Sequence, residues 1–125
     1  MNCVDSSGWL EYLSDGPNAD KFEDPLNDIG NLIVSAINIY EVFKVVLRES
    51  DENMALHAAA LMQQGNVVDV NSEIALHAAK ISSDFKIPMA YSIIVATARR
   101  YEAIIWTQDR DFQGIEKVKY FPKTQ

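Results

Sequence analysis

The stretch PMAYSIIVATARRYEAIIWTQDRDF, residues 88–112, decides the fold. Small and apolar residues after Pro88 predict a helix from about Ala90 to Tyr101. The apolar run 103–106 then predicts a buried strand, and the polar residues 107–111 predict a loop after it. A helix leading into a buried strand that ends in carboxylates is typical of a parallel α/β sheet with a ligand site at its edge.

The same alternation of strands and helices extends through the rest of the chain. Short apolar runs predict further strands at residues 2–5, 31–35, 67–70 and 118–121. Helical spacing predicts helices around residues 9–13 and at 36–49, 51–64 and 73–84, whereas the acidic segment 19–29 fits either a short helix or an irregular connection. The pattern therefore predicts one α/β domain over residues 1–125, a parallel sheet flanked by helices on both faces.

Length and composition agree with a single soluble domain. The chain has 125 residues, of which 48% are hydrophobic, enough for one continuous core. Its only cysteine, Cys3, excludes an internal disulfide and lies in an apolar stretch, which predicts a buried thiol. Asp5 interrupts any leader-like run, and no segment approaches the roughly 20 apolar residues of a membrane span. We therefore expect a cytoplasmic protein with no membrane contact.

Charge is distributed unevenly along the chain. The net charge is −7, which argues against a surface coated in basic residues. Residues 1–52 carry eleven acids and three bases (3 − 11 = −8), and residues 53–125 carry seven acids and eight bases (8 − 7 = +1). The second half is therefore the part suited to a polyanion, through Lys86, Arg99, Arg100 and Arg110.

Carboxylates stand at the ends of two predicted strands, and a further carboxylate lies in the helix that follows another strand. Asp5 ends the first strand, Asp109 and Asp111 follow the fourth, and Glu41 lies in the helix after the second. At about 6 Å and an effective dielectric constant of about 20, two such charges repel by roughly 3 kcal/mol. A bound cation offsets this repulsion, and carboxylates without a Cys/His cluster favour Mg²⁺ or Mn²⁺.

Other catalytic chemistries find little support. The sequence lacks a G-x-S-x-G elbow, a phosphate-binding G-x-x-x-x-G-K-[ST] loop, an H-E-x-x-H motif and a dinucleotide-binding glycine fingerprint. His57 and His77 have no second ligand at metal-binding spacing and are expected at a helix surface or core edge. A phosphatase-like or response-regulator-like domain also uses strand-end acids, but its mid-chain phospho-acceptor and strand-end lysine are not evident.

Four pieces of the sequence resemble the PIN-domain nucleases, and most closely the VapC-type toxins of prokaryotic toxin–antitoxin pairs. They are Val4-Asp-Ser-Ser7, the step from Ser35 to Glu41, the block 88–98 and Trp106-Thr-Gln-Asp-Arg-Asp-Phe112. Their order and spacing cover essentially the whole chain. The resemblance implies a ribonuclease that hydrolyses RNA phosphodiester bonds with Mg²⁺ or Mn²⁺ held by three or four acids.

The resemblance implies that the family's catalytic acids fall on Asp5, Glu41 and Asp109, with Asp111 as a helper carboxylate near the metal. The remaining metal-ligand aspartate falls on position 91, which is Tyr91 here. A neutral phenol cannot supply the anionic oxygen that Mg²⁺ prefers, and its ring adds bulk. One base change converts an Asp codon to a Tyr codon, so our hypothesis is that Tyr91 inactivates a metal site.

The resemblance also implies partners. These are an RNA substrate, a small antitoxin protein and a second copy of the chain in a homodimer. Phosphate contacts are expected from Lys44, Arg99 and Arg100. Trp9, Tyr12, Phe43 and Val46 are candidates for an apolar antitoxin surface, although their pattern also fits a core. The alternative function is a catalytically silent PIN-like module in which a native Tyr91 fills the cleft and the protein only binds RNA or a protein.

Overall fold

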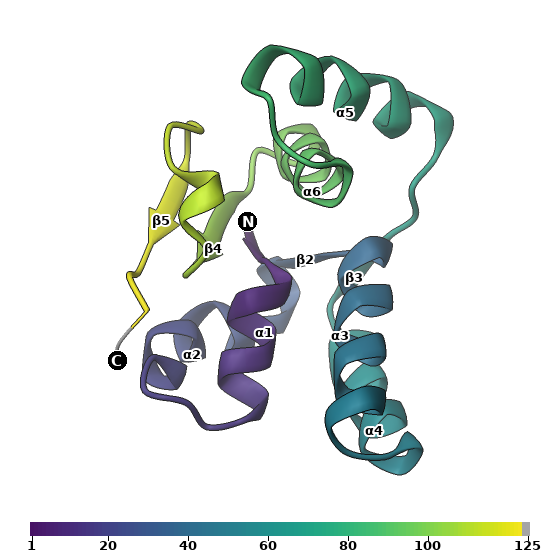
Figure 1. Cartoon of the computed structure of the whole chain (residues 1–125), viewed down its shortest axis with the longest axis vertical. Helices are drawn as coiled ribbons and strands as arrows, with labels where there is room; N and C mark the ends of the chain where they lie inside the picture. The colour runs from purple at the N-terminus through teal and green to yellow at the C-terminus, as the bar shows by residue number, and fades with distance from the viewer. Residues whose placement is uncertain (124–125) are drawn as a thin grey trace.

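The predicted strands form one parallel sheet in the computed structural model, which describes residues 1–123 (Figure 1). They are β1 (Asn2–Val4), β2 (Leu32–Ser35), β3 (Asn66–Val68), β4 (Ile104–Thr107) and β5 (Val118–Tyr120). The order across the sheet is β3-β2-β1-β4-β5, and Cys3 of β1 pairs with both Ile33 and Ile105. The chain turns to opposite sides after β1 and after β4, so these neighbouring strands form the switch point where such sheets bind ligands.

Six helices connect the strands within residues 1–123. They are α1 (Ser6–Leu13), α2 (Ala19–Asn27), α3 (Ala36–Glu49), α4 (Glu52–Met62), α5 (Ser72–Phe85) and α6 (Met89–Arg100), with short 3₁₀ turns η1 (Ile29–Asn31) and η2 (Arg110–Phe112). The acidic segment left open by the sequence is therefore mostly helical. No helix within residues 1–123 is both long and apolar enough to cross a membrane.

Polar side chains fix where several helices begin. Asp5, Ser35, Asp51 and Asn71 each accept a hydrogen bond from a backbone N–H in the first turn of the helix that follows. These contacts satisfy donors that a helix leaves open at its N-terminus. They explain why α1 and α3 start directly at the carboxyl ends of β1 and β2, which brings both helix starts to the same edge of the sheet.

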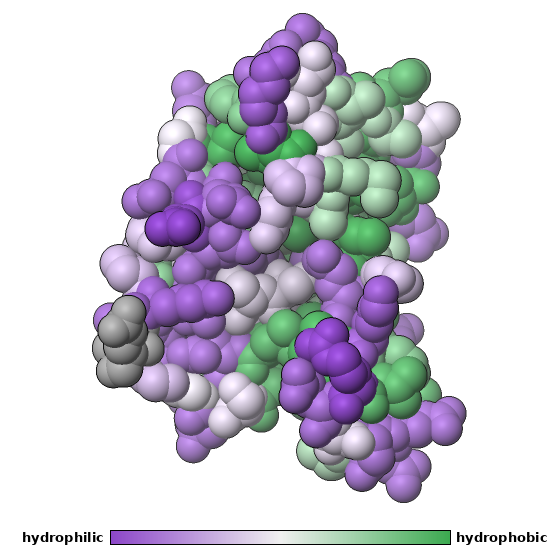
Figure 2. Space-filling model, viewed as in Figure 1, coloured by the Kyte–Doolittle hydropathy of each residue, from purple (hydrophilic) through white to green (hydrophobic). Residues whose placement is uncertain are grey.

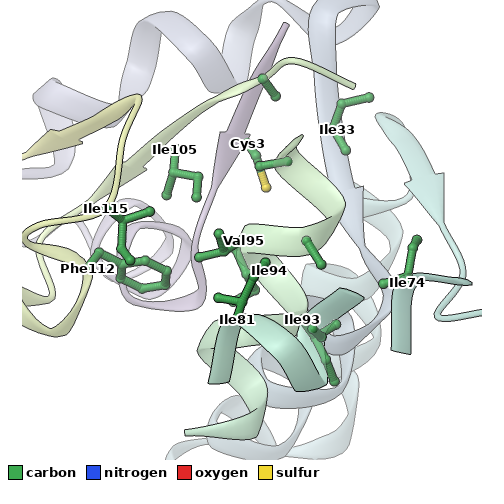
Figure 3. Packing of buried hydrophobic residues seen from close by; sticks show 14 residues of the cluster. Cys3, Ile33, Ile74, Ile81, Ile93, Ile94, Val95, Ile105, Phe112 and Ile115 are labelled. Carbon is green, nitrogen blue, oxygen red and sulfur yellow. The ribbon is translucent and has the colours of Figure 1, made fainter. Parts of the chain in front are cut away.

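Alternating strand residues divide the core between the two faces of the sheet. Cys3, Ile33 and Ile105 pack with α5 and α6, and Figure 3 shows this cluster between the sheet and those helices. Val4 and Val34 point to the other face, where they pack with residues of α1, α2, α3 and α4. Helices thus cover both faces, which confirms the α/β architecture expected from the sequence.

The lone cysteine and the histidines lie where the sequence predicts. Burial raises the pKa of Cys3 to about 12, with a smaller contribution from the charge of Asp5, so the thiol stays protonated. His57 on α4 and His77 on α5 are both exposed. Cys3 is a core residue, and neither histidine is in contact with the carboxylates described below.

Candidate active site

Asp5 is a buried carboxylate at the end of β1. It is only 2% exposed and accepts hydrogen bonds from the Gly8 backbone N–H at 3.0 Å and from Ser7 Oγ at 2.9 Å. Burial raises its pKa to about 6, although hydrogen bonds from Gly8, Ser7 and Thr107 act in the opposite direction. The negative charge of Asp109 contributes a further, smaller increase. Asp5 is thus held in place by donors but is electrostatically unfavourable when ionised.

Asp109 lies beside Asp5 because β4 pairs with β1 in parallel. Its backbone N–H donates to Thr107 Oγ1 at 2.9 Å, and its Oδ1 accepts from the Asp111 backbone N–H at 3.0 Å. Thr107 Oγ1 is also 3.5 Å from Ser7 Oγ, the hydroxyl that contacts Asp5. Two hydroxyl groups therefore connect the Asp5 carboxylate to the backbone N–H of Asp109.

Glu41 reaches the same region from the second turn of α3. Its Oε1 accepts a hydrogen bond of 2.7 Å from Ser6 Oγ, the residue after Asp5. Ser6 Oγ accepts in turn from Asn38 Nδ2 at 3.0 Å. Asn38 is fully buried, and among residues 1–123 its Oδ1 has no hydrogen-bond partner. An acceptor without a donor is thus fixed one turn before Glu41.

Tyr91, in the first turn of α6, is directed at these carboxylates. Its hydroxyl donates a 2.6 Å hydrogen bond to Asp109 Oδ2, and its ring packs edge to face against Phe112 with centroids 5.0 Å apart. Burial and the hydrogen bond to Asp109 raise the pKa of Tyr91. The phenol therefore stays neutral at physiological pH and acts as a donor.

Asp5, Glu41, Tyr91 and Asp109 all line one cleft of about 180 Å³. The surface also has larger hollows, one of about 640 Å³, which shares Leu10 and Val45 with this cleft, and one of about 570 Å³. The first is an apolar groove beside α1, α3 and α4, and the second lies near the C-terminal end of α6. We assign the site to the smaller cleft because it alone among these three contains the strand-end carboxylates at the switch point.

As it stands, the cleft does not provide a metal site. Within the described residues, no three Asp, Glu, His or Cys side chains are grouped so that they could hold a metal ion. Glu41 is engaged by Ser6, and one oxygen of Asp109 accepts from Tyr91. Tyr91 brings a neutral donor where Mg²⁺ prefers an anionic oxygen. The donor set therefore does not fit a divalent ion while position 91 is tyrosine.

The other predicted site residues lie outside the cleft walls. Asp111 is exposed and contacts Asp109 through its backbone only. Lys44 is exposed on α3, with Nζ 5.7 Å from the Tyr40 ring centroid. Arg99 and Arg100 lie in the last turn of α6, the opposite end from Tyr91, where Arg100 pairs with Glu73. The structure does not bring these two arginines to the carboxylates.

Asn38 was missed by the sequence analysis. The signal available was its position three residues before Glu41, since residues at that spacing share one face of a helix. Its fixed contact to Ser6 makes it part of the cleft framework.

Comparison with known proteins identifies the family. A sequence profile of the PIN domain matches residues 3–118. Because this match spans most of the 125 residues, the chain belongs to the PIN-domain family. No curated protein matches the sequence.

Several solved structures share the fold over nearly the full length. A toxin–antitoxin complex from Klebsiella pneumoniae matches with a TM-score of 0.80 at 20% identity, covering 98% of this chain and 100% of that chain. VapC20 of Mycobacterium tuberculosis, a sarcin-ricin loop cleaving toxin, matches with a TM-score of 0.80 at 15% identity over 98% and 100% of the two chains. DNA-bound VapBC from Salmonella typhimurium gives 0.76 at 15% identity, with 98% of each chain covered.

Proposed function

We propose that this protein is built as a divalent-metal ribonuclease toxin and that Tyr91 disables it by taking the place of a metal-ligand carboxylate. The observation that carries the proposal is the convergence of Asp5, Glu41 and Asp109 on one cleft, with Tyr91 among them. Membership of the PIN-domain family and the similarity to VapC20, a sarcin-ricin loop cleaving toxin, support a nuclease.

An aspartate at position 91 would complete the donor set. It would remove the phenol hydrogen bond to Asp109 and add a third carboxylate beside Asp5 and Asp109. Three carboxylates would supply the anionic oxygen ligands that Mg²⁺ and Mn²⁺ prefer. Such an ion, when bound, would act as a Lewis acid toward water and the phosphodiester. We propose that Glu41, which accepts a hydrogen bond from Ser6, would accept a proton or position water.

An RNA cleavage assay tests this proposal. Tyr91→Asp with Mn²⁺ should cleave a labelled single-stranded RNA at least about 100-fold faster than the unsubstituted chain, since losing an outer-shell partner of a metal alone costs 10–100-fold. The double variant Tyr91→Asp, Asp5→Ala should lose this activity, as should Tyr91→Asp in EDTA. A folded Tyr91→Asp protein that remains inert with Mn²⁺ and Mg²⁺ would reject the hypothesis that Tyr91 inactivates a metal site.

The second candidate is a silent module in which Tyr91 is native. This reading is favoured by how well the side chain fits, because it donates to Asp109 and packs on Phe112. Such a module would bind RNA or a protein at the cleft without cutting. It predicts that the unsubstituted chain binds this RNA or protein more tightly than Tyr91→Asp does. A disabled enzyme predicts instead that Tyr91→Asp binds RNA more tightly once the metal is present.

Exposed apolar surfaces support the proposed protein partners. The groove of about 640 Å³ is lined by Leu10, Leu13, Val46, Met54 and Leu61, which suits the apolar face of an antitoxin helix. Trp9, by contrast, is only 3% exposed and belongs to the core.

Leu76 and Met89 are 74% and 70% exposed, and we propose that a second copy of the chain covers them. A monomer mass in sedimentation equilibrium would contradict the homodimer.

We keep Lys44 as a proposed phosphate contact at the rim of the cleft, one turn beyond Glu41 on α3. Arg99 and Arg100 would contact only RNA that extends along α6 away from the cleft. With RNA as the substrate, we propose that the protein acts in the cytoplasm.

A further inference from the structure

A basic and aromatic segment lies beside the cleft on the β5 side. Residues 117–123 read KVKYFPK, with three lysines, two aromatic residues and no acid. β5 is the edge strand next to β4, which carries Asp109 at its carboxyl end. In Figure 2, hydrophilic side chains gather at the left of the view, on the side where Figure 1 places β5. An otherwise acidic protein thus has a local cationic region next to its candidate active site.

A groove of about 370 Å³ is formed between this segment and the turn after β4. It is lined by Gln108, Asp109, Arg110, Tyr120, Pro122 and Lys123. Asp109 also lines the carboxylate cleft, so the two hollows share a wall. The volume falls within the range of small-ligand pockets, about 300–1,000 Å³.

The cations of the groove are available for a ligand. Across residues 1–123 the ion pairs are Arg48–Glu49, Lys80–Asp84 and Arg100–Glu73. None of them includes Arg110 or Lys123, and both of these side chains are exposed. Lys119 adds a further ammonium group on the same edge, 4.3 Å from the Trp106 ring centroid.

Buried hydrogen bonds hold the groove in shape. Asn18 Nδ2 donates to Gln108 Oε1 and to the Pro122 carbonyl, both at 3.0 Å, and Asn18 is only 2% exposed. The Phe121 backbone N–H donates to the Thr107 carbonyl at 2.9 Å. The backbone after β5 is therefore fixed against the end of β4, which holds the main chain that carries Tyr120 and Lys123 beside the turn that carries Arg110.

We propose that this groove binds the nucleotide adjacent to the cleft in a single-stranded RNA. Arg110 and Lys123 contact backbone phosphates, and the Tyr120 ring stacks on an unpaired base. Single strands are bound by such a combination of cations and aromatic faces, whereas the bases of a duplex are already stacked. The assignment rests on the proposed function, which supplies RNA as the ligand of the neighbouring cleft.

Fluorescence anisotropy with a fluorescein-labelled oligouridine, in EDTA to prevent cleavage, tests the groove on the full chain. Arg110→Ala and Lys123→Ala should each weaken binding about fivefold or more, and each should lower the slope of log affinity against log salt by about 0.7. Tyr120→Ala should weaken binding about fivefold or more, whereas Tyr120→Phe should retain it because the ring remains. Lys80→Ala, on the exposed side of α5, is the matched control and should bind as the unsubstituted chain does.

Two results would overturn the groove assignment. One is no oligouridine binding by the unsubstituted chain, and the other is equal affinity in Arg110→Ala, Lys123→Ala and Lys80→Ala, which would leave this surface to a protein partner. Cleavage by Tyr91→Asp with binding insensitive to Arg110 and Lys123 would reject the groove alone. An inert Tyr91→Asp whose binding still depends on these cations would reject the nuclease and keep the groove.

Discussion

At the scale of single residues, Asp5 combines a well-formed hydrogen-bond environment with an unfavourable charge. Its carboxylate caps α1 and is nearly inaccessible to water. Burial is the dominant reason that its pKa rises to about 6 from an ordinary 3.8. Such conflict between stability and charge is common at functional sites, where a group is kept for chemistry rather than for folding.

Asp5→Asn should therefore stabilise the protein at pH 7. The folded chain retains the Asp5 proton up to about pH 6, whereas the unfolded chain loses it near the ordinary value of 3.8. Asp5 therefore lowers the free energy of unfolding progressively as pH rises from about 4 to about 6, and this loss of stability remains at higher pH. Because asparagine caps a helix as well as aspartate, the variant should gain about 1–3 kcal/mol in free energy of unfolding at pH 7.

Urea denaturation at pH 4 and pH 7 measures this effect. The difference between Asp5→Asn and the unsubstituted chain should be near zero at pH 4 and largest at pH 7. Asp69→Asn, at an exposed position after β3, is the control and should show no such dependence. A variant that is destabilised equally at both pH values would contradict the assigned burial of the charge.

At the scale of elements, the attachment of α1 to the sheet depends on a glycine. A Cβ atom added at Gly8 would lie 2.6 Å from Val4 Cγ1 and 2.8 Å from Phe22 Cε1. Val4 and Phe22 are both fully buried, so neither can move easily. The close approach lets α1 begin directly after β1, which places Ser6 and Ser7 at the cleft.

Gly8→Ala should destabilise the fold although alanine favours helix by about 1 kcal/mol over glycine. Overpacking of the core should outweigh this gain and lower the free energy of unfolding by about 1–3 kcal/mol. Gly30→Ala is the matched control, because a Cβ there would meet no atom within 4 Å. Thermal unfolding followed by circular dichroism measures both variants, and a Gly8→Ala protein as stable as Gly30→Ala would contradict the packing described.

Periodicity predicted where these helices and strands begin and end in the sequence, but not which end of a helix lies at the cleft. Each predicted strand is present, and α3, α5 and α6 start and end within two residues of expectation. The sequence did not show the direction in which the helix carries its basic residues: Arg99 and Arg100 follow Tyr91 closely in sequence, yet the helix places Arg99 about 12 Å from Tyr91 along its axis. Sequence proximity to a motif therefore did not indicate proximity to the cleft.

At the scale of the whole molecule, the site depends on which strands are neighbours. Periodicity alone does not give the order β3-β2-β1-β4-β5, which places Asp5 beside Asp109 although more than 100 residues separate them. The expectation that they converge came from the rule for parallel sheets and from the family resemblance. The position of Glu41 likewise depends on Ser35 ending β2 and capping α3.

The distribution of charge around the site also becomes visible only in the folded molecule. The chain is acidic overall, yet residues 117–123 carry three lysines, and Lys123 lines a groove that also contains Asp109. Residue counts along the sequence located the excess of bases in the second half but not the groove, because Asn18 and Gln108 from distant segments shape it. The cleft and the groove together form the surface on which RNA binding and cleavage are proposed.

Tyr91 is proposed to occupy the place of a metal-ligand carboxylate in a cleft that is lined by Asp5, Glu41 and Asp109. Titration of Mn²⁺ followed by electron paramagnetic resonance, which detects the free ion, measures this directly. Tyr91→Asp should bind Mn²⁺ at least about tenfold more tightly than the unsubstituted chain, and adding Asp109→Asn should abolish the gain. Equal Mn²⁺ affinity in Tyr91→Asp and the unsubstituted protein, both folded, would contradict the claim.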